Sequence, residues 1–268
     1  MYAALKMSSS FGPQSKYREI NGRSLYIETY GSLSATPVIL LHHGLGTTRA
    51  WKEQIPALLR EGYCVIAYDR WGYGLSQPRN CPITPEFFDD IDDLRVLVEK
   101  VYSSPLMLIG HSDGGTIASY FAASYPDQVA CLISVASHIY VEPKMETGIR
   151  GVKSIFQKDE RFREGLFRVH GEKYEQVFYN WYEGWLNPDN LRWDMREHLH
   201  KIISPTLIIQ GNEDEHATPQ HAQDMAASIS KAELWLVQGV GHMFPQDQPE
   251  MFNQRIVSFL EQKCSAKS

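Results

Sequence analysis

Residues 106–115, LMLIGHSDGG, carry the first side chain that could act as a nucleophile. An apolar run leads into His111, Ser112 and Asp113, and two glycines follow. The run predicts a buried strand, and the glycines predict a sharp turn into a helix. Such a turn exposes a serine hydroxyl at the sheet edge and points backbone N–H groups at an anion forming on a substrate. We therefore predict that Ser112 is a nucleophile; a purely structural turn is the alternative.

A serine hydroxyl is a poor nucleophile at neutral pH unless a general base takes its proton. The chain has ten histidines, and His242 lies in the glycine-rich stretch QGVGHMFP directly after a strand-like run. Side chains that follow parallel strands gather at one edge of the sheet, so His242 is expected to reach Ser112. His111, beside the serine, is expected to pack or hydrogen-bond within the turn instead.

The base needs an acid that fixes its tautomer and stabilises the imidazolium. Asp214 lies in GNEDEHATP, directly after the strand-like run PTLIIQG, and Glu213 and Glu215 flank it. All three carboxylates are candidates on position alone. We predict Asp214, chiefly because of a family resemblance given below.

Acyl transfer also needs two N–H donors for the negatively charged oxygen of the tetrahedral intermediate. The N–H of Asp113, immediately after the nucleophile, is one predicted donor of this oxyanion hole. The loop HHGLG (42–46) is expected to supply the other from Leu45, because Gly44 and Gly46 allow close approach to a substrate. The carboxylate of Asp113 could also bind a cationic group of a substrate.

Other potential ligands do not form a metal or cofactor site. His42 and His43 are adjacent, so in an extended strand their side chains point to opposite faces. His198 and His200 are two apart on a predicted helix and also diverge. The sequence lacks a phosphate-binding glycine loop and zinc-ligand spacing. We therefore predict neither a cofactor nor a metal.

The elements that must position these residues alternate between strand and helix. An alternating pattern predicts a half-exposed strand at 24–31. Apolar runs predict strands at 37–44, 63–69, 106–110, 130–137, 205–211 and 233–239. Amphipathic runs predict helices around 51–59 and at 83–101, 114–125, 218–229 and 249–262. This order predicts an α/β fold with a mostly parallel sheet covered by helices on both faces.

The alternation is interrupted over residues 138–200, which contain many aromatics and no strand-like run. We predict a core made of residues 1–137 and 202–268, with a helical cap, 138–201, inserted between core strands. The aromatics either pack a small core of their own or line an apolar pocket above the sheet, and both roles are compatible.

Together these motifs resemble the α/β-hydrolase superfamily over nearly the whole chain. The matching segments are HHGLG (42–46), DRWGYGLS (69–76), GHSDGG (110–115), GNEDEH (211–216) and GVGHMFP (239–245). The resemblance implies an α/β-hydrolase fold and a triad in the chain order Ser112, Asp214, His242. It also implies that DRWGYGLS is a structural turn.

Within the superfamily the chain looks most like the capped esterases and carbon–carbon bond hydrolases. It departs from haloalkane dehalogenases and epoxide hydrolases, which have an aspartate at the position of Ser112. It also lacks the glycine- and proline-rich oxyanion loop of the ring-cleavage-product hydrolases. We predict a serine hydrolase that cleaves a small-to-medium carboxylic ester through an acyl-enzyme. The alternatives are a carbon–carbon bond hydrolase and a small-molecule receptor with a slow triad, and peracid formation, as in cofactor-free haloperoxidases, is a possible side activity.

The composition is ordinary for a globular protein. Of the 268 residues, 43% are hydrophobic and 22% charged, the formal net charge is −6, and no strongly basic run occurs. This argues against nucleic acid or an anionic membrane as the main partner, and favours a small-molecule substrate with an apolar part.

The cysteines and the N-terminal sequence bear on the compartment. The four cysteines show no CxxC spacing, and Cys64 and Cys131 lie in apolar runs. We therefore expect reduced, structural thiols. The start, MYAALKMSSSFG, lacks the apolar region of a signal peptide. These features predict a cytoplasmic protein.

Overall fold

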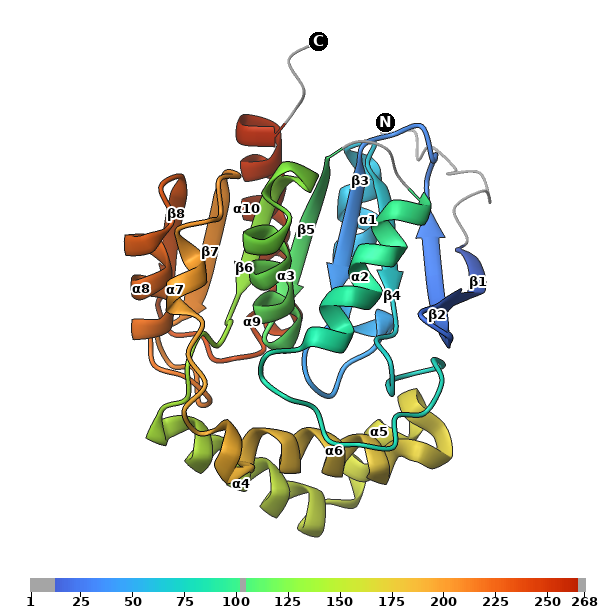
Figure 1. The fold of residues 1–268 in the computed structure, drawn as a ribbon, viewed down its shortest axis with the longest axis vertical. Coiled ribbons are helices and arrows are strands. Elements are labelled where there is room, and N and C mark those ends of the chain that lie inside the picture. Colours follow the sequence, from blue (N-terminus) through green and yellow to red (C-terminus); the bar gives the residue numbers. More distant parts are fainter. Residues whose placement is uncertain (1–12, 102–104, 265–268) are drawn as a thin grey trace, which may run out of the picture.

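The architecture is a single eight-stranded sheet covered by helices on both faces (Figure 1), seen in a computed structural model that describes residues 13–101 and 105–264. The strand order is β1-β2-β4-β3-β5-β6-β7-β8. The strands are β1 (Gln14–Ile20), β2 (Arg23–Tyr30), β3 (Pro37–Leu41), β4 (Cys64–Tyr68), β5 (Leu106–His111), β6 (Val129–Val135), β7 (Thr206–Gly211) and β8 (Ala232–Val237). Along the sheet, every neighbouring pair from β4 through β3, β5, β6 and β7 to β8 is parallel. The pairs β1 with β2 and β2 with β4 are antiparallel. The predicted α/β fold class is confirmed.

Two hydrophobic clusters lie on opposite faces of this sheet. In β3, Ile39 and Leu41 belong to one cluster, and Val38 and Leu40 belong to the other. Because side chains alternate along a strand, a strand buried on both faces must be apolar throughout, which explains the continuous apolar runs.

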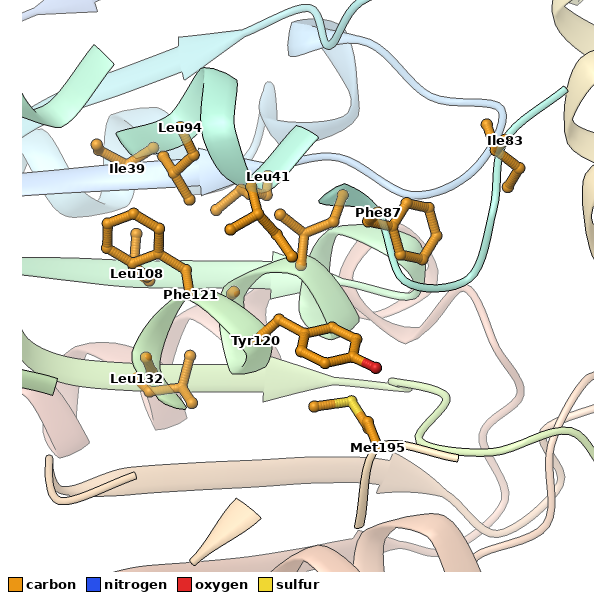
Figure 2. Packing of buried hydrophobic residues seen from close by; sticks show 14 of the residues in the cluster. Ile39, Leu41, Ile83, Phe87, Leu94, Leu108, Tyr120, Phe121, Leu132 and Met195 are labelled. Atoms are coloured by element: carbon orange, nitrogen blue, oxygen red, sulfur yellow. The ribbon is translucent and has the colours of Figure 1, made fainter. Parts of the chain in front are cut away.

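Each cluster is completed by its own helices. The first cluster packs under α2 (Phe88–Val101), α3 (Asp113–Ser124), α7 (Arg196–Leu199) and α8 (Gln220–Ser228). The second packs under α1 (Gln54–Arg60), α9 (Phe244–Asp247) and α10 (Pro249–Cys264). Figure 2 shows the first cluster, where Phe121 of α3 lies beside Leu108 of β5 and Leu94 of α2 lies near Ile39 and Leu41 of β3.

Two elements differ from the sequence-based expectations. Strand β1 was not expected, because six of its seven residues are exposed; its pairing with β2, in which Tyr17 faces Tyr26, does not need an apolar pattern. Helix α2 begins at Phe88 rather than at Ile83. The N–H of Ile83 instead donates to the carbonyl of Asn180 at 3.1 Å, which attaches this loop to the helices inserted between β6 and β7.

The expectation of reduced thiols is wrong at Cys131, which is disulfide-bonded. Its position in an apolar strand predicts burial but does not reveal which other thiol approaches it. Cys81 is an exposed free thiol. The cysteine argument for a cytoplasmic location therefore fails. No helix in residues 13–101 and 105–264 is long and apolar enough to cross a bilayer.

Between β6 and β7 the chain forms an insertion that contains α4 (Pro143–Lys158), α5 (Glu160–His170), α6 (Tyr174–Leu186) and the short helix α7. Figure 1 shows α4, α5 and α6 beyond the edge where the parallel strands end. A short neck closes the insertion: Tyr140 bridges Asp194, and the N–H of Met195 donates to the carbonyl of Ile139 at 2.8 Å. The domain boundaries predicted at 138 and 201 stay predictions.

Candidate active site

Ser112 lies at a strained turn between β5 and α3. Its backbone has φ 55° and ψ −122°, a left-handed region that a residue with a side chain rarely adopts. The N–H of Ser112 donates to the carbonyl of Val135 at 2.8 Å, and the carbonyl of Ser112 accepts from the N–H of Gly115 at 2.8 Å. These bonds hold the turn between two buried strands, and the residue next in sequence starts the helix.

The flanking glycines are required by close backbone contacts. A Cβ added at Gly110 would lie 2.2 Å from the carbonyl oxygen of Gly114. A Cβ added at Gly114 would lie 2.1 Å from the carbonyl oxygen of Leu41. Neither position can therefore hold a larger residue without moving the backbone of the turn.

His242 and Asp214 form a buried pair. Nδ1 of His242 lies 2.8 Å from Oδ2 of Asp214. The same carboxylate accepts from the side-chain amide of Gln210 at 2.7 Å and from the N–H groups of His216 and Ala217 at 2.8 and 3.1 Å. Because an ionised carboxylate only accepts hydrogen bonds, Nδ1 of His242 carries a proton, and Nε2 holds the lone pair that a base needs.

The electrostatics keep Asp214 ionised. Burial by itself would raise its pKa, but the charge and hydrogen bond of His242 outweigh burial and hold the pKa well below the usual range. Burial likewise opposes the charge on His242. The negative charges of Asp214 and Glu215 outweigh it, so the pKa of His242 lies above its ordinary value. The surroundings of His242 thus favour its imidazolium form.

The two glutamates that flank Asp214 have different environments. Glu213 is exposed. Glu215 lies at the cavity wall, and its Oε2 accepts from the backbone N–H of His242 at 3.0 Å. Among the three candidate acids, therefore, Asp214 alone contacts the imidazole ring, and Glu215 holds the backbone of the same histidine.

Ser112 and His242 line one cavity of about 300 Å³. Its apolar wall comes mainly from the insertion: Met145, Ile149, Val152 and Ile155 of α4, Phe162 of α5, and Trp181 and Trp185 of α6. The predicted apolar pocket is therefore present, and α6 contributes two indole rings to it. Other aromatics of the insertion pack against one another, as in the stacked rings of Phe156 and Phe178, whose centroids are 3.9 Å apart.

The two predicted oxyanion donors also border this cavity. Leu45 lies in the loop after β3, and Asp113 is the first residue of α3. In the part of the chain that the structure describes, neither backbone N–H donates a hydrogen bond to the protein. Both groups thus stay available to an anionic oxygen, and the N-terminus of α3 adds a favourable dipole.

The carboxylate of Asp113 already has a cationic partner. Arg70 is fully buried, with Nη2 3.6 Å from Oδ2 of Asp113 and Nη1 3.2 Å from Oδ1 of Asp90. The indole N–H of Trp185 donates to Oδ1 of Asp113 at 3.1 Å. Burial raises the pKa of Asp113 to about 6, against the opposing effect of Arg70. The sequence does not indicate this ion pair. Arg70 is the cation that binds the Asp113 carboxylate, where the sequence had suggested a cationic group of a substrate.

DRWGYGLS forms a structural turn. The carboxylate of Asp69 accepts from the N–H groups of Thr48 and Leu75, each at 2.7 Å. The N–H of Arg70 donates to Nε2 of His42 at 3.1 Å. This turn therefore supports the loop that carries Leu45 and does not enter the cavity.

Several histidines surround the candidate base. Nε2 of His111 lies 2.9 Å from the carbonyl oxygen of His242, while His43, His138 and His216 line the cavity. Burial lowers the pKa of His43 to about 3 and that of His216 to about 4. No group of three metal-ligating side chains occurs among the described residues. No sequence motif marks His138 or His216 as site residues, because only the fold brings them to this edge.

Comparisons with known proteins identify the family of this fold. Residues 37–198 match the family model described as the alpha/beta hydrolase fold. The chain is 25% identical to the serine hydrolase BPHL of Mus musculus, over 90% of this chain and 84% of that protein. It is 26% identical to the bifunctional esterase/perhydrolase DCH of Acinetobacter calcoaceticus, over 90% and 97% of the two chains.

A solved structure shows the same fold. The thermophilic esterase from Thermogutta terrifontis superposes with a TM-score of 0.74 at 24% identity, covering 94% of this chain and all of that one. The family match spans more than half of the present sequence, and it includes the loop of Leu45, the Ser112 turn and most of the insertion. The chain therefore belongs to the α/β hydrolase fold family.

Proposed function

We propose that this chain is a serine hydrolase that cleaves a small-to-medium carboxylic ester through an acyl-enzyme at Ser112. One observation carries the proposal. A serine in a strained turn and a histidine hydrogen-bonded to a buried aspartate at 2.8 Å border the same cavity. Similarity to an esterase/perhydrolase and to an esterase supports this reaction class.

In the acylation step, the hydroxyl oxygen of Ser112 attacks the ester carbonyl carbon and its proton passes to Nε2 of His242. The N–H groups of Leu45 and Asp113 hold the resulting oxyanion. Asp214 stabilises the imidazolium and stays ionised. Collapse of the tetrahedral intermediate breaks the ester C–O bond, and His242 returns its proton to the leaving alcohol.

In the deacylation step, His242 takes a proton from water, and the resulting hydroxide attacks the acyl carbon. The second tetrahedral intermediate collapses to release the carboxylic acid, and Ser112 regains its proton from His242. No step needs a cofactor or a metal.

The cavity supports a substrate with an apolar part. Its volume of about 300 Å³ is near the lower end of the range for small-molecule sites. The wall formed by α4 and α5 is apolar, whereas the polar groups gather around Ser112. An acyl chain or alcohol of modest length fits this division.

Hydrolysis of p-nitrophenyl esters from acetate to decanoate, by wild type and Ser112→Ala, tests the proposal. Multiple turnovers that disappear in the variant are expected, with the best chain length reporting the depth of the cavity. A single slow burst would favour a receptor, and no reaction with any ester would favour carbon–carbon bond cleavage.

Peracid formation is a second candidate, because two relatives are named as a perhydrolase and a non-heme chloroperoxidase. In this reaction hydrogen peroxide replaces water in the attack on the acyl-enzyme, and a peracid leaves with Ser112 restored. Adding hydrogen peroxide and acetate and measuring peracetic acid tests it; the product is expected to require Ser112.

A further inference from the structure

His170, the last residue of α5, lies between two core loops that are distant from it in sequence. Its Nε2 is 3.1 Å from the carbonyl oxygen of Leu45. Its Nδ1 accepts from the backbone N–H of Gly74 at 2.9 Å. The imidazole is buried. One side chain of the insertion therefore contacts both the loop after β3 and the turn after β4.

The contacts define the protonation of this ring. A backbone N–H can only donate, so Nδ1 of His170 carries a lone pair, and Nε2 carries the proton that is donated to Leu45. Burial lowers the pKa of His170 to about 4, so the ring is neutral near pH 7. Both ring nitrogens are then in use, and His170 has no remaining group to exchange protons with a substrate.

The N–H of Gly46 donates to the carbonyl of His43 at 3.0 Å and closes a turn over Gly44 and Leu45, while the side chain that binds the carbonyl of Leu45 itself is that of His170. Other contacts fix the ends of the loop. Asp69 holds Thr48, and Nδ1 of His42 lies 2.8 Å from the carbonyl oxygen of His43. Between these anchors Leu45 is flanked by two glycines, which restrict the backbone little. The bond to the Leu45 carbonyl orients the peptide unit between Leu45 and Gly46. It therefore limits the φ and ψ values open to Leu45 and, through them, the direction of the Leu45 N–H in the preceding peptide unit.

The end of α5 is itself held in place. Lys173, three residues after His170, donates to the carbonyl oxygens of Tyr73 and Ser76. His170 and Lys173 thus both form hydrogen bonds with the turn after β4. The position of the imidazole is set by this docking as well as by the packing of α5.

We propose that His170 is a positioning residue for the oxyanion hole, so that α5 of the insertion is part of the catalytic geometry. This inference rests on the proposed ester hydrolysis. Removing one oxyanion donor typically lowers kcat by about 10²–10³-fold. Loosening a donor without deleting it should cost less, about 10- to 100-fold in kcat by the same measure.

The experiment compares His170→Leu, which lacks both polar contacts, with His170→Gln, whose amide can accept from Gly74 and donate to Leu45. Measurements are kcat, KM and the affinity for an alkylboronic acid, which forms a tetrahedral anion on Ser112. His170→Leu is expected to lower kcat and boronate affinity together, with KM within about threefold of wild type by the logic of transition-state binding. His170→Gln is expected to recover most of both.

Leu166→Ala serves as the matched control, because Leu166 is buried in the same helix and belongs to the hydrophobic core. It should lower Tm and leave kcat and boronate affinity near those of wild type. Equal losses in Leu166→Ala and His170→Leu, or an unchanged kcat in His170→Leu, would overturn the positioning role. The boronate adduct needs no ester, so it tests His170 even if the wild type proves not to be an esterase.

Discussion

Nδ1 of His242 lies 2.8 Å from Oδ2 of Asp214, although the two residues are 28 positions apart and follow different strands. The other carboxylate oxygen faces two backbone N–H groups. An asparagine at 214 would therefore turn its oxygen toward those groups and its NH₂ toward His242. The imidazole would then have to accept at Nδ1, which moves its proton to Nε2 and removes the base.

We accordingly expect Asp214→Asn to lower kcat on the order of 10⁴-fold, as the corresponding change does in other triads. Ester hydrolysis under saturating substrate measures the effect. Glu213→Gln, next in sequence and exposed, is the control and should be close to wild type. Nearly full activity in Asp214→Asn would assign the acid to another residue.

The pH profile should report the raised pKa of His242. Because the base must be neutral, kcat/KM is expected to fall as the pH drops through that pKa, with a midpoint above the ordinary value of about 6.5. Glu215→Gln keeps an acceptor for the His242 N–H but removes a negative charge. It should shift the midpoint to lower pH and leave the plateau largely intact.

The same ionisation has a consequence for stability. A histidine whose pKa is raised on folding contributes stability below the unfolded value of about 6.5, and this contribution is lost as pH rises through the folded pKa. The difference in free energy of unfolding between wild type and Glu215→Gln should therefore be larger at pH 5.5 than at pH 8.5. Urea titrations at the two pH values measure it, and an equal difference at both would show that Glu215 does not act on His242 through its charge.

The strain at Ser112 predicts opposite effects on activity and stability. Ser112→Gly and Ser112→Ala should both abolish turnover. Glycine relieves a strain of about 1–3 kcal/mol, offset by about 0.4–1 kcal/mol of extra freedom in the unfolded chain. Ser112→Gly is thus expected to be about 1 kcal/mol more stable than Ser112→Ala in denaturant unfolding. Equal stabilities would mean that the turn is relaxed.

Two glycine substitutions should have contrasting outcomes. Gly110→Ala would place a Cβ 2.2 Å from a backbone oxygen, so we expect little folded protein. Gly151, within α4, has no atom within 4 Å of an added Cβ. Gly151→Ala should raise the free energy of unfolding by about 0.4–1 kcal/mol. Comparable destabilisation of both variants in thermal melts would contradict the close packing of the turn.

Much of this architecture could be predicted because buried parallel strands have a recognisable sequence pattern. A strand such as β3, buried on both faces, must be apolar throughout, and the residue that follows it must lie at the functional edge. That single rule places Leu45, Ser112, Asp214 and His242 together without any knowledge of distances.

What could not be predicted depends on contacts between distant segments. Nothing local to Arg70 indicates that it neutralises Asp113, and nothing in α5 marks His170 as a partner of Leu45. The edge strand β1 could not be predicted for a different reason. Backbone hydrogen bonds to β2 hold it in place, and these do not depend on which side chains it carries. Pair contacts of these kinds leave no periodic signal.

The neck formed by the Tyr140–Asp194 bridge also has a consequence for how proteins of this shape can diversify. A segment whose ends are already clamped together adds loop-closure entropy only slowly as it lengthens. The helices beyond the neck could thus be exchanged for longer or shorter ones without altering the strands that position Ser112, Asp214 and His242. Such an exchange would also remove the imidazole of His170 that binds the carbonyl of Leu45. A replacement segment would therefore need a hydrogen-bond donor of its own at that carbonyl.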